Sequence, residues 1–265
     1  MKIIFMGRKK YAAELIEWTL SQGVEIAAVV TDSHFPNSPT AQKASELRIP
    51  VISMEEAENI LYEPDHQIDL IVSYLFWKKI KEPLISGPSF GCINFHPALL
   101  PEWRGTAGYN MAILNKLPKW GATAHYVDSE IDTGNIIRTF KFNFDYRMET
   151  AASLEKKTQE IQVELYKSVL LDVISSQGRL DSVKQDVHQG RYITRVEMEE
   201  MKEIDLIKDD IDLKIRAFWF PPYNGAFIEV EGKKYTLIND FILKQLMNKD
   251  STANVVTSEK RLVKN

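Results

Sequence analysis

The sequence has one cysteine, no long apolar run and no excess of positive charge. Cys92 cannot form a disulfide within the chain, and it lies in an apolar segment without metal-ligand neighbours. No apolar run approaches the ~18 residues that cross a bilayer. The six residues before Gly7 are too few for the apolar core of a signal peptide. We therefore expect a soluble, cytoplasmic protein without membrane contact.

The charge balance disfavours a nucleic-acid partner. The 33 basic residues are outnumbered by 37 acidic residues, which gives a formal net charge of −4. Such a chain has no global positive field to attract tRNA or DNA, although a local basic patch would be compatible with this balance. With 265 residues and 44% hydrophobic content, the chain suits one large domain with a small appendage.

The beginning of the chain predicts a parallel sheet. An apolar strand at 2–6, a helix at 11–20 and a strand at 24–31 form a βαβ unit, whose crossovers are right-handed. The glycine motif of dinucleotide sites is missing after the first strand, so we exclude NAD binding. Arg8 lies where ligands of such sheets collect, and it could meet a phosphate or belong only to the turn at Gly7.

The remaining periodicity extends this α/β pattern to about residue 178 and a smaller α+β segment beyond it. Ser53 and Glu56 form a capping box pattern before a helix. We expect a catalytic domain at 1–178, a helix and hairpin subdomain at 179–243 and a flexible tail at 244–265. The expected strands are 68–74, 90–95, 121–127 and 135–144, the helices are 40–47, 149–177 and 209–218, and the hairpin joins 226–230 to 235–238.

The stretch Cys92 to Pro101 begins as a buried strand and ends in a loop with two polar side chains. Strand alternation places Asn94 and His96 on one face. On their own, these two residues could be structural or functional. The acidic loop before Gly134 adds Asp132 after a later strand of the same sheet. We expect the three side chains to meet at one edge of the sheet.

An amide, an imidazole and a carboxylate together suit acyl transfer without a covalent enzyme intermediate. Asn94 can donate a hydrogen bond to a developing oxyanion, and His96 can do so if it is protonated. Asp132 is expected to keep His96 protonated and to accept a proton from an attacking amine. No Ser or Cys nucleophile is paired with the histidine. Zinc is disfavoured, because no second His or Cys lies at ligand spacing.

Three separated segments carry a family resemblance. Residues 94–101 (NFHPALLP), 104–105 (RG) and 132–136 (DTGNI) resemble the signature of formyltransferases that use N10-formyltetrahydrofolate. The resemblance implies a Rossmann-like, mostly parallel sheet flanked by helices, with Asn94, His96 and Asp132 as the catalytic triad. It also implies a donor site made by Ser73, Tyr74, Phe76, Trp77, Ile80, Asp128 and Asp132, although Phe76 and Trp77 are equally compatible with covering the sheet.

The resemblance leaves several formyl acceptors to compare. Family members that act on glycinamide ribonucleotide begin with a glycine-rich phosphate loop, from which residues 7–10 depart. Members that act on methionyl-tRNA resemble residues 216–227 and continue into a basic β-barrel of about a hundred residues, a whole domain by size. Here the sequence ends some forty residues later with an acidic balance. The chain therefore most resembles sugar-nucleotide N-formyltransferases of surface-polysaccharide and O-antigen synthesis.

This resemblance implies a dTDP- or UDP-linked amino sugar as the acceptor, with dTDP expected. Arginines pair with diphosphates and aromatic faces stack on bases. The aromatic residues of 219–223 could instead form a core plug. The expected acceptor-binding residues are Arg8, Arg104, Gly105, Thr106, Tyr192, Arg195, Arg216, Trp219 and Tyr223.

Two other functions fit the same residues. One is formylation of methionyl-tRNA or another amine, and the other is non-catalytic binding of folate or a nucleotide sugar. The sequence leaves open the base, the sugar carbon that carries the amine, and the oligomeric state. We expect a homodimer, because apolar residues of the small hairpin can pair two subunits.

Overall fold

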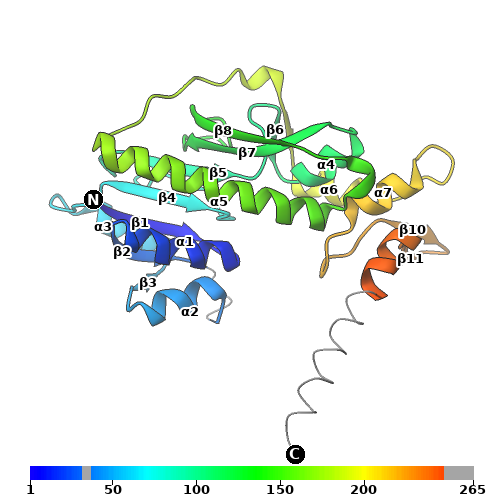
Figure 1. Cartoon of the computed structure of the whole chain (residues 1–265), viewed down its shortest axis with the longest axis horizontal. Coiled ribbons are helices and arrows are strands. Elements are labelled where there is room, and N and C mark those ends of the chain that lie inside the picture. Colours follow the sequence, from blue (N-terminus) through cyan, green and yellow to red (C-terminus); the bar gives the residue numbers. More distant parts are fainter. Residues whose placement is uncertain (32–36, 248–265) are drawn as a thin grey trace, which may run out of the picture. The chain divides into compact units, whose positions relative to one another are not determined.

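The computed structural model describes residues 1–31 and 37–247 (Figure 1). A seven-stranded sheet has the order β3-β2-β1-β4-β5-β7-β8. Strands β1 to β5 run parallel, and the pairs β5–β7 and β7–β8 are antiparallel. The predicted mostly parallel α/β fold is confirmed. The strands of this sheet are β1 (Lys2–Gly7), β2 (Glu25–Val30), β3 (Val51–Ile52), β4 (Leu70–Tyr74), β5 (Cys92–His96), β7 (Lys119–Tyr126) and β8 (Ile136–Asn143).

The helices follow the expected order. The capping box of α3 is formed, because Ser53 Oγ accepts from the Glu56 N–H and Glu56 accepts from the Ser53 N–H. The helices are α1 (Lys9–Ser21), α2 (Pro39–Glu46), α3 (Met54–Tyr62), α4 (Gly108–Leu114), α5 (Ala151–Ser176), α6 (Arg195–Glu200) and α7 (Ile211–Phe218), with 3-10 turns at Tyr146–Met148 and Val187–Gln189.

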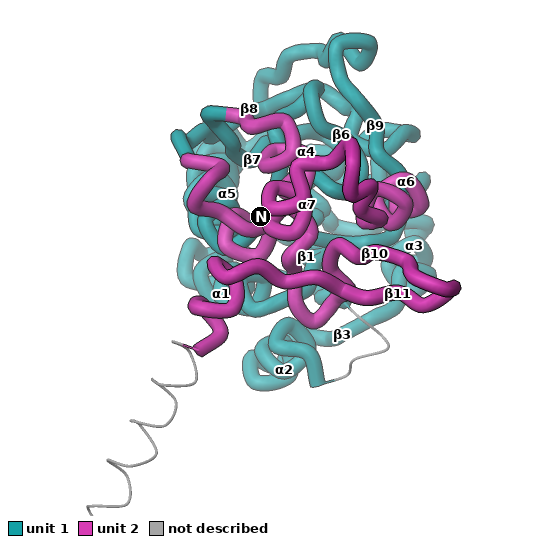
Figure 2. Tube along the Cα trace, turned by 90° about the vertical axis from the view of Figure 1, so that its right-hand side faces the viewer, with its two compact units in different colours: residues 1–108, 118–144, 155–194 teal, residues 109–117, 145–154, 195–265 magenta. Residues whose placement is uncertain are grey.

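The chain divides into two compact units that alternate along the sequence (Figure 2). The first unit comprises residues 1–108, 118–144 and 155–194, and the second comprises 109–117, 145–154 and 195–265. The second unit contains the antiparallel hairpin β10 (Phe227–Val230) and β11 (Lys233–Thr236). Residues 240–247 are helical, and 248–265 of the expected tail lie outside the described residues. The predicted boundary at 178 stays a prediction.

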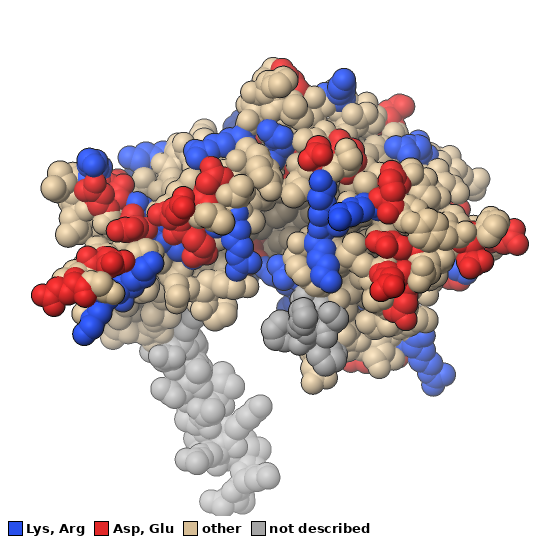
Figure 3. Space-filling view, turned by 180° about the vertical axis from the view of Figure 1, so that it is seen from behind, with Lys and Arg blue, Asp and Glu red and all other residues tan. Residues whose placement is uncertain are grey.

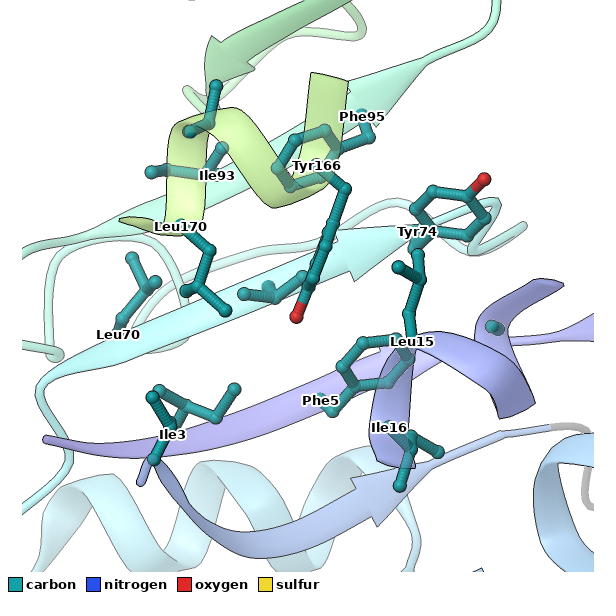
Figure 4. Close-up of a cluster of buried hydrophobic side chains, with 14 of the residues drawn as sticks. Ile3, Phe5, Leu15, Ile16, Leu70, Tyr74, Ile93, Phe95, Tyr166 and Leu170 are labelled. Atoms are coloured by element: carbon teal, nitrogen blue, oxygen red, sulfur yellow. The ribbon is translucent and has the colours of Figure 1, made fainter. Parts of the chain in front are cut away.

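An aromatic core fixes the central strands of the first unit (Figure 4). Tyr166 of α5 is fully buried, and its ring centroid lies 5.0 Å from that of Phe95 and 6.2 Å from that of Phe5. Its hydroxyl lies 2.6 Å from the Thr19 hydroxyl, which satisfies the buried polar end of the ring. Because Ile93 and Phe95 belong to this core, the alternate residues of β5 face the other side of the sheet.

A short parallel pair was not predicted. Strand β6 (Trp103–Gly105) pairs with β9 (Arg191–Ile193), and neither segment is among the expected strands. Gly105 has a φ of +79°, and a Cβ there would lie 2.5 Å from the Ile193 carbonyl oxygen. A side chain is therefore excluded at this position. Three-residue strands carry too little alternation to be recognised in a sequence.

The surface mixes charges of both signs. On the face seen in Figure 3, lysines and arginines are interspersed with aspartates and glutamates. Among the described residues, no helix combines the length and apolar character needed to cross a membrane.

Candidate active site

The first unit brings the three predicted side chains together at the end of β5. His96 Nδ1 lies 3.5 Å from Asp132 Oδ1. Asn94 is joined to Asp132 through a second imidazole, because Asn94 Nδ2 lies 3.0 Å from His125 Nε2, which is 3.6 Å from Asp132 Oδ1. An amide, two imidazoles and a carboxylate thus share one small region.

The backbone around Asp132 is held in an unusual conformation. Asp132 has a φ of +58°, in the left-handed region that only glycine adopts freely. The Gly105 N–H donates to Asp132 Oδ2 at 2.9 Å, and Gln185 Nε2 donates to the carbonyl oxygens of Asp132 and Gly134. The short strand β6 and Gln185 therefore hold the carboxylate in place. A strained backbone conformation that several surrounding contacts hold in place is typical of functional sites.

The local contacts fix which nitrogen of His96 carries its proton. His96 Nε2 lies 2.9 Å from the Trp103 carbonyl oxygen, and a carbonyl only accepts, so Nε2 donates. In a neutral ring, Nδ1 then carries the lone pair that faces Asp132. The His96 side chain is 8% exposed. Burial lowers the pKa of His96 below its ordinary value, although the Asp132 charge acts in the opposite direction.

This finding corrects one expectation. Asp132 was expected to keep His96 protonated, but the cost of burying a charged ring outweighs the attraction of the carboxylate. Burial alone would raise the pKa of Asp132. The hydrogen bond from the Gly105 N–H acts in the opposite direction, and the pKa of Asp132 lies well below its usual range. The resting site therefore holds an ionised Asp132 and a His96 that favours its neutral form.

His125 is a site residue that sequence reasoning missed. It lies within β7, is 2% exposed and contacts both Asn94 and Asp132. The available signal was a histidine inside an otherwise apolar strand.

No group of three or more His, Cys, Asp or Glu residues within 1–31 and 37–247 could hold a metal ion.

The model of the formyl transferase family matches residues 1–170. The chain belongs to this family. Methionyl-tRNA formyltransferase of Thermotoga neapolitana is 30% identical over 254 residues, which cover 89% of this chain and 78% of that protein. The predicted family and the enzyme class, a transferase, are thereby confirmed.

Solved formyltransferases share the fold. A 4-N formyltransferase from Francisella tularensis is 27% identical with a TM-score of 0.74, and the match covers 90% of this chain and 96% of that one. An N-formyltransferase from Helicobacter canadensis, solved with folinic acid and dTDP-3-aminofucose, is 24% identical with a TM-score of 0.71. That match covers 88% of this formyltransferase and 86% of the other chain.

The residues expected around the formyl donor have different surroundings in the structure. Ser73 donates to Asn94 Oδ1 at 2.8 Å and so joins the site. Phe76 and Trp77 are half-buried after β4, with ring centroids 4.7 Å apart. Asp128 orders the acidic loop by accepting from the Thr133 hydroxyl at 2.6 Å. Ile80 is buried in a cluster on the opposite face of the sheet from the Tyr166 core.

Tyr74 requires a correction. Its side chain is fully buried, its hydroxyl donates to Gln159 at 3.2 Å, and its ring packs against Tyr166. Because strand alternation points Ser73 and Tyr74 in opposite directions, only Ser73 faces the site. The Tyr74 side chain is not available to a ligand.

The acceptor residues expected in the first unit have mixed surroundings. Arg8 donates to the Leu75 carbonyl oxygen at 3.2 Å, and its guanidinium lies 5.3 Å from the Trp77 ring centroid. Arg104 donates to the Val187 carbonyl oxygen at 3.0 Å. Thr106 donates from both its N–H and its hydroxyl to the Ile193 carbonyl oxygen. The Tyr192 side chain is 41% exposed, beside Gly105.

Among the acceptor residues expected in the second unit, Arg216 has surroundings that differ from the expected ones. Arg216 is 5% exposed, and it donates to Asp212 and to the backbone carbonyls of Tyr146 and Glu149. Its Nε and Nη1 groups therefore bind the protein itself, and its burial disfavours contact with a diphosphate. The remaining residues are accessible, since Arg195 and Tyr223 are exposed and Trp219 is half-buried.

Proposed function

We propose that this formyltransferase moves a formyl group from N10-formyltetrahydrofolate to the amine of a nucleotide-linked amino-dideoxy sugar, with dTDP as the expected nucleotide. The product would serve surface polysaccharides such as O-antigen. The Francisella tularensis relative is a 4-N formyltransferase, and the Helicobacter canadensis enzyme was solved with a folate and a dTDP-linked amino sugar. These relatives support both substrates.

The charge of the second unit favours a nucleotide-linked sugar over tRNA as the formyl acceptor. Between residues 195 and 247, 8 basic residues are outnumbered by 11 acidic residues. Four of these basic residues form ion pairs within the unit: Lys202, Lys208, Lys214 and Arg216. A tRNA-binding surface needs several unpaired cations that displace counterions from phosphates. The described part of this unit has few lysines and arginines without an ion pair.

The aromatic loop after β4 suits the flat pterin of the donor. Phe76 and Trp77 are half-buried and lie next to the strand that carries Ser73. Aromatic rings in such positions bind planar ligands by stacking. In the proposed complex, Phe76 and Trp77 orient the donor and Asn94 meets the formyl oxygen.

The proposed reaction begins when the neutral amine attacks the formyl carbon. The oxyanion that forms accepts a hydrogen bond from the Asn94 side chain, an interaction worth about 3 kcal/mol when the donor is preorganised. The negative charge that develops beside His96 raises the proton affinity of its Nδ1. The resting neutral ring can therefore accept a proton during the reaction.

Proton transfer then completes the exchange. The amine nitrogen gives its proton to the pair formed by His96 Nδ1 and Asp132, which lie 3.5 Å apart. As the bond between the formyl carbon and N10 breaks, the pair returns one proton to N10. The products are an N-formyl sugar and tetrahydrofolate, and the pair recovers its starting charge.

The test is turnover with a matched panel of acceptors. The enzyme is incubated with N10-formyltetrahydrofolate and with dTDP- or UDP-linked sugars that carry the amine at carbon 3 or carbon 4. Methionyl-tRNA serves as the competing acceptor. We expect one dTDP-linked sugar to gain the mass of one CO with equimolar tetrahydrofolate. Formylation of methionyl-tRNA alone would overturn the proposal.

A second candidate is formylation of methionyl-tRNA, because the Thermotoga neapolitana relative carries that name at 30% identity. A tRNA affinity that falls steeply with salt would favour it. If folate and nucleotide sugar bind without any turnover, the chain is a binding protein. The cytoplasmic location and the homodimer stay predictions.

A further inference from the structure

Four polar groups form a chain of hydrogen bonds across three strands. Ser73, Asn94 and His125 lie opposite one another on β4, β5 and β7. The Ser73 hydroxyl donates to Asn94 Oδ1 at 2.8 Å, and Asn94 Nδ2 lies 3.0 Å from His125 Nε2. His125 Nδ1 lies 2.7 Å from the Tyr126 carbonyl oxygen. This row of hydrogen bonds, from Ser73 through Asn94 and His125, thus ends on a backbone carbonyl, which can only accept a hydrogen bond.

The direction of each bond follows from this carbonyl. A carbonyl oxygen only accepts, so His125 Nδ1 carries a hydrogen. In a neutral ring, Nε2 then has a lone pair and must accept. Its partner is therefore the NH2 group of Asn94, and the Asn94 oxygen faces Ser73. The Tyr126 carbonyl in this way determines which end of the Asn94 amide faces His125.

We propose that His125 is a positioning residue that holds the Asn94 amide with its N–H groups toward the reacting centre. One N–H of Asn94 is used by His125. The second has no hydrogen-bond acceptor within the part of the chain that the structure describes, and it is the donor for the formyl oxygen. With the amide reversed, a carbonyl oxygen would face the oxyanion and repel it. This inference rests on the proposed formyl transfer.

His125 also lies 3.6 Å from Asp132, so the experiment must separate two routes of action. His125→Leu removes the acceptor and keeps much of the side-chain volume, whereas His125→Gln retains an acceptor near the position of Nε2. The kinetic effect of each substitution is measured both in the wild-type background and in the Asn94→Ala background. His66→Gln serves as a control at a histidine whose ring nitrogen accepts from the Ile68 N–H, outside the row.

We expect His125→Leu to lower kcat by about ten- to a hundredfold, with KM values within about threefold of wild type. His125→Gln should recover most of the loss. In the Asn94→Ala background, His125→Leu should change kcat by less than about twofold, because the group it positions is gone. An equal loss in both backgrounds would overturn the proposal, and so would an unchanged kcat in His125→Leu.

A readout without an acceptor separates this inference from the proposed function. In long-range 1H–15N spectra of the histidine rings, we expect His125 as the Nδ1–H tautomer. Asn94→Ala should shift its Nε2 resonance and leave that of Nδ1 nearly unchanged. An Nε2–H tautomer would overturn the positioning role. If no amine is formylated while the tautomer is as expected, the proposed function fails and the orientation of the amide stands.

Discussion

His96 Nδ1 lies 3.5 Å from Asp132 Oδ1, while His96 Nε2 donates to the Trp103 carbonyl oxygen. Both nitrogens of this buried ring therefore have assigned neighbours before any substrate arrives. The ring is oriented by the backbone on one side and faces an ionised carboxylate on the other. In the proposed reaction, this arrangement favours proton acceptance by His96, and Asn94 binds the oxyanion.

Replacement of Asn94 by alanine should lower kcat strongly with little effect on substrate binding. Removal of one preorganised oxyanion donor costs about 10²- to 10³-fold in kcat. The KM of the formyl donor should change by less than about threefold, because the hydrogen bond strengthens only as charge develops. Steady-state kinetics measures both values. A large rise in KM with unchanged kcat would show that Asn94 binds the ground state instead.

Replacement of Asp132 by asparagine should remove the carboxylate of the His96–Asp132 pair that accepts the proton, while the Gly105 hydrogen bond is retained. We expect kcat to fall about 10²- to 10⁴-fold, the range of general acid–base contributions. The pKa of His96 should fall further, since the carboxylate that raises it is lost. NMR titration of the His96 ring measures that shift. Wild-type turnover in Asp132→Asn would contradict the assigned role.

The stability of the protein should decrease as the pH falls below about 6.5, the ordinary pKa of histidine. Because the folded pKa of His96 is lower than this value, the unfolded chain binds a proton that the folded chain does not. The stabilising effect of the low Asp132 pKa is complete above about pH 3.9, the ordinary pKa of Asp. It disappears only in stronger acid, as the pH falls through the folded pKa.

Urea unfolding at about pH 7.5 and about pH 5.5 measures this dependence in wild type and in His96→Gln. The variant should lose less stability on acidification than wild type does. Parallel losses in the two proteins would mean that the folded pKa of His96 is not lowered.

Gly134→Ala should displace the loop that carries Asp132. A Cβ at Gly134 would lie 1.9 Å from the Tyr126 carbonyl oxygen, a backbone atom that cannot swing aside. We expect a loss of about 1–3 kcal/mol in the free energy of unfolding, together with reduced kcat. Gly178→Ala is the matched control, because its nearest neighbour is 3.8 Å away. Equal stability of both variants would contradict this geometry.

Arg216→Met should destabilise the second unit and leave acceptor affinity in the remaining folded protein unchanged. The guanidinium satisfies the carbonyls of Tyr146 and Glu149 as well as Asp212, and hydrogen bonds to charged groups contribute about 1.5–3 kcal/mol each. Arg195→Met, at an exposed position, should change stability by less than about 0.5 kcal/mol. Full stability of Arg216→Met with weaker sugar-nucleotide binding would restore the ligand role.

Prediction from the sequence succeeded for features that depend on local periodicity. It was incomplete for side chains whose contacts come from other segments of the chain. The βαβ opening, the Ser53–Glu56 capping box and the alternation of β5 follow from short patterns. The burial of the Tyr74 and Arg216 side chains was not predicted, because composition does not reveal whether such side chains point into the core or toward a ligand. His125 was missed since Asn94, its hydrogen-bond partner, lies 31 residues away in the sequence, on the neighbouring strand β5.

The most direct test of the central claim is a competition between two formyl acceptors. Wild type and Asp132→Asn are each mixed with N10-formyltetrahydrofolate, a dTDP-linked amino sugar and methionyl-tRNA in the same tube, and mass spectrometry identifies the formylated amine. We expect wild type to formylate the sugar amine and Asp132→Asn to do so at least about a hundredfold more slowly. Formyl transfer to tRNA alone, or equal rates in the two proteins, would contradict the account.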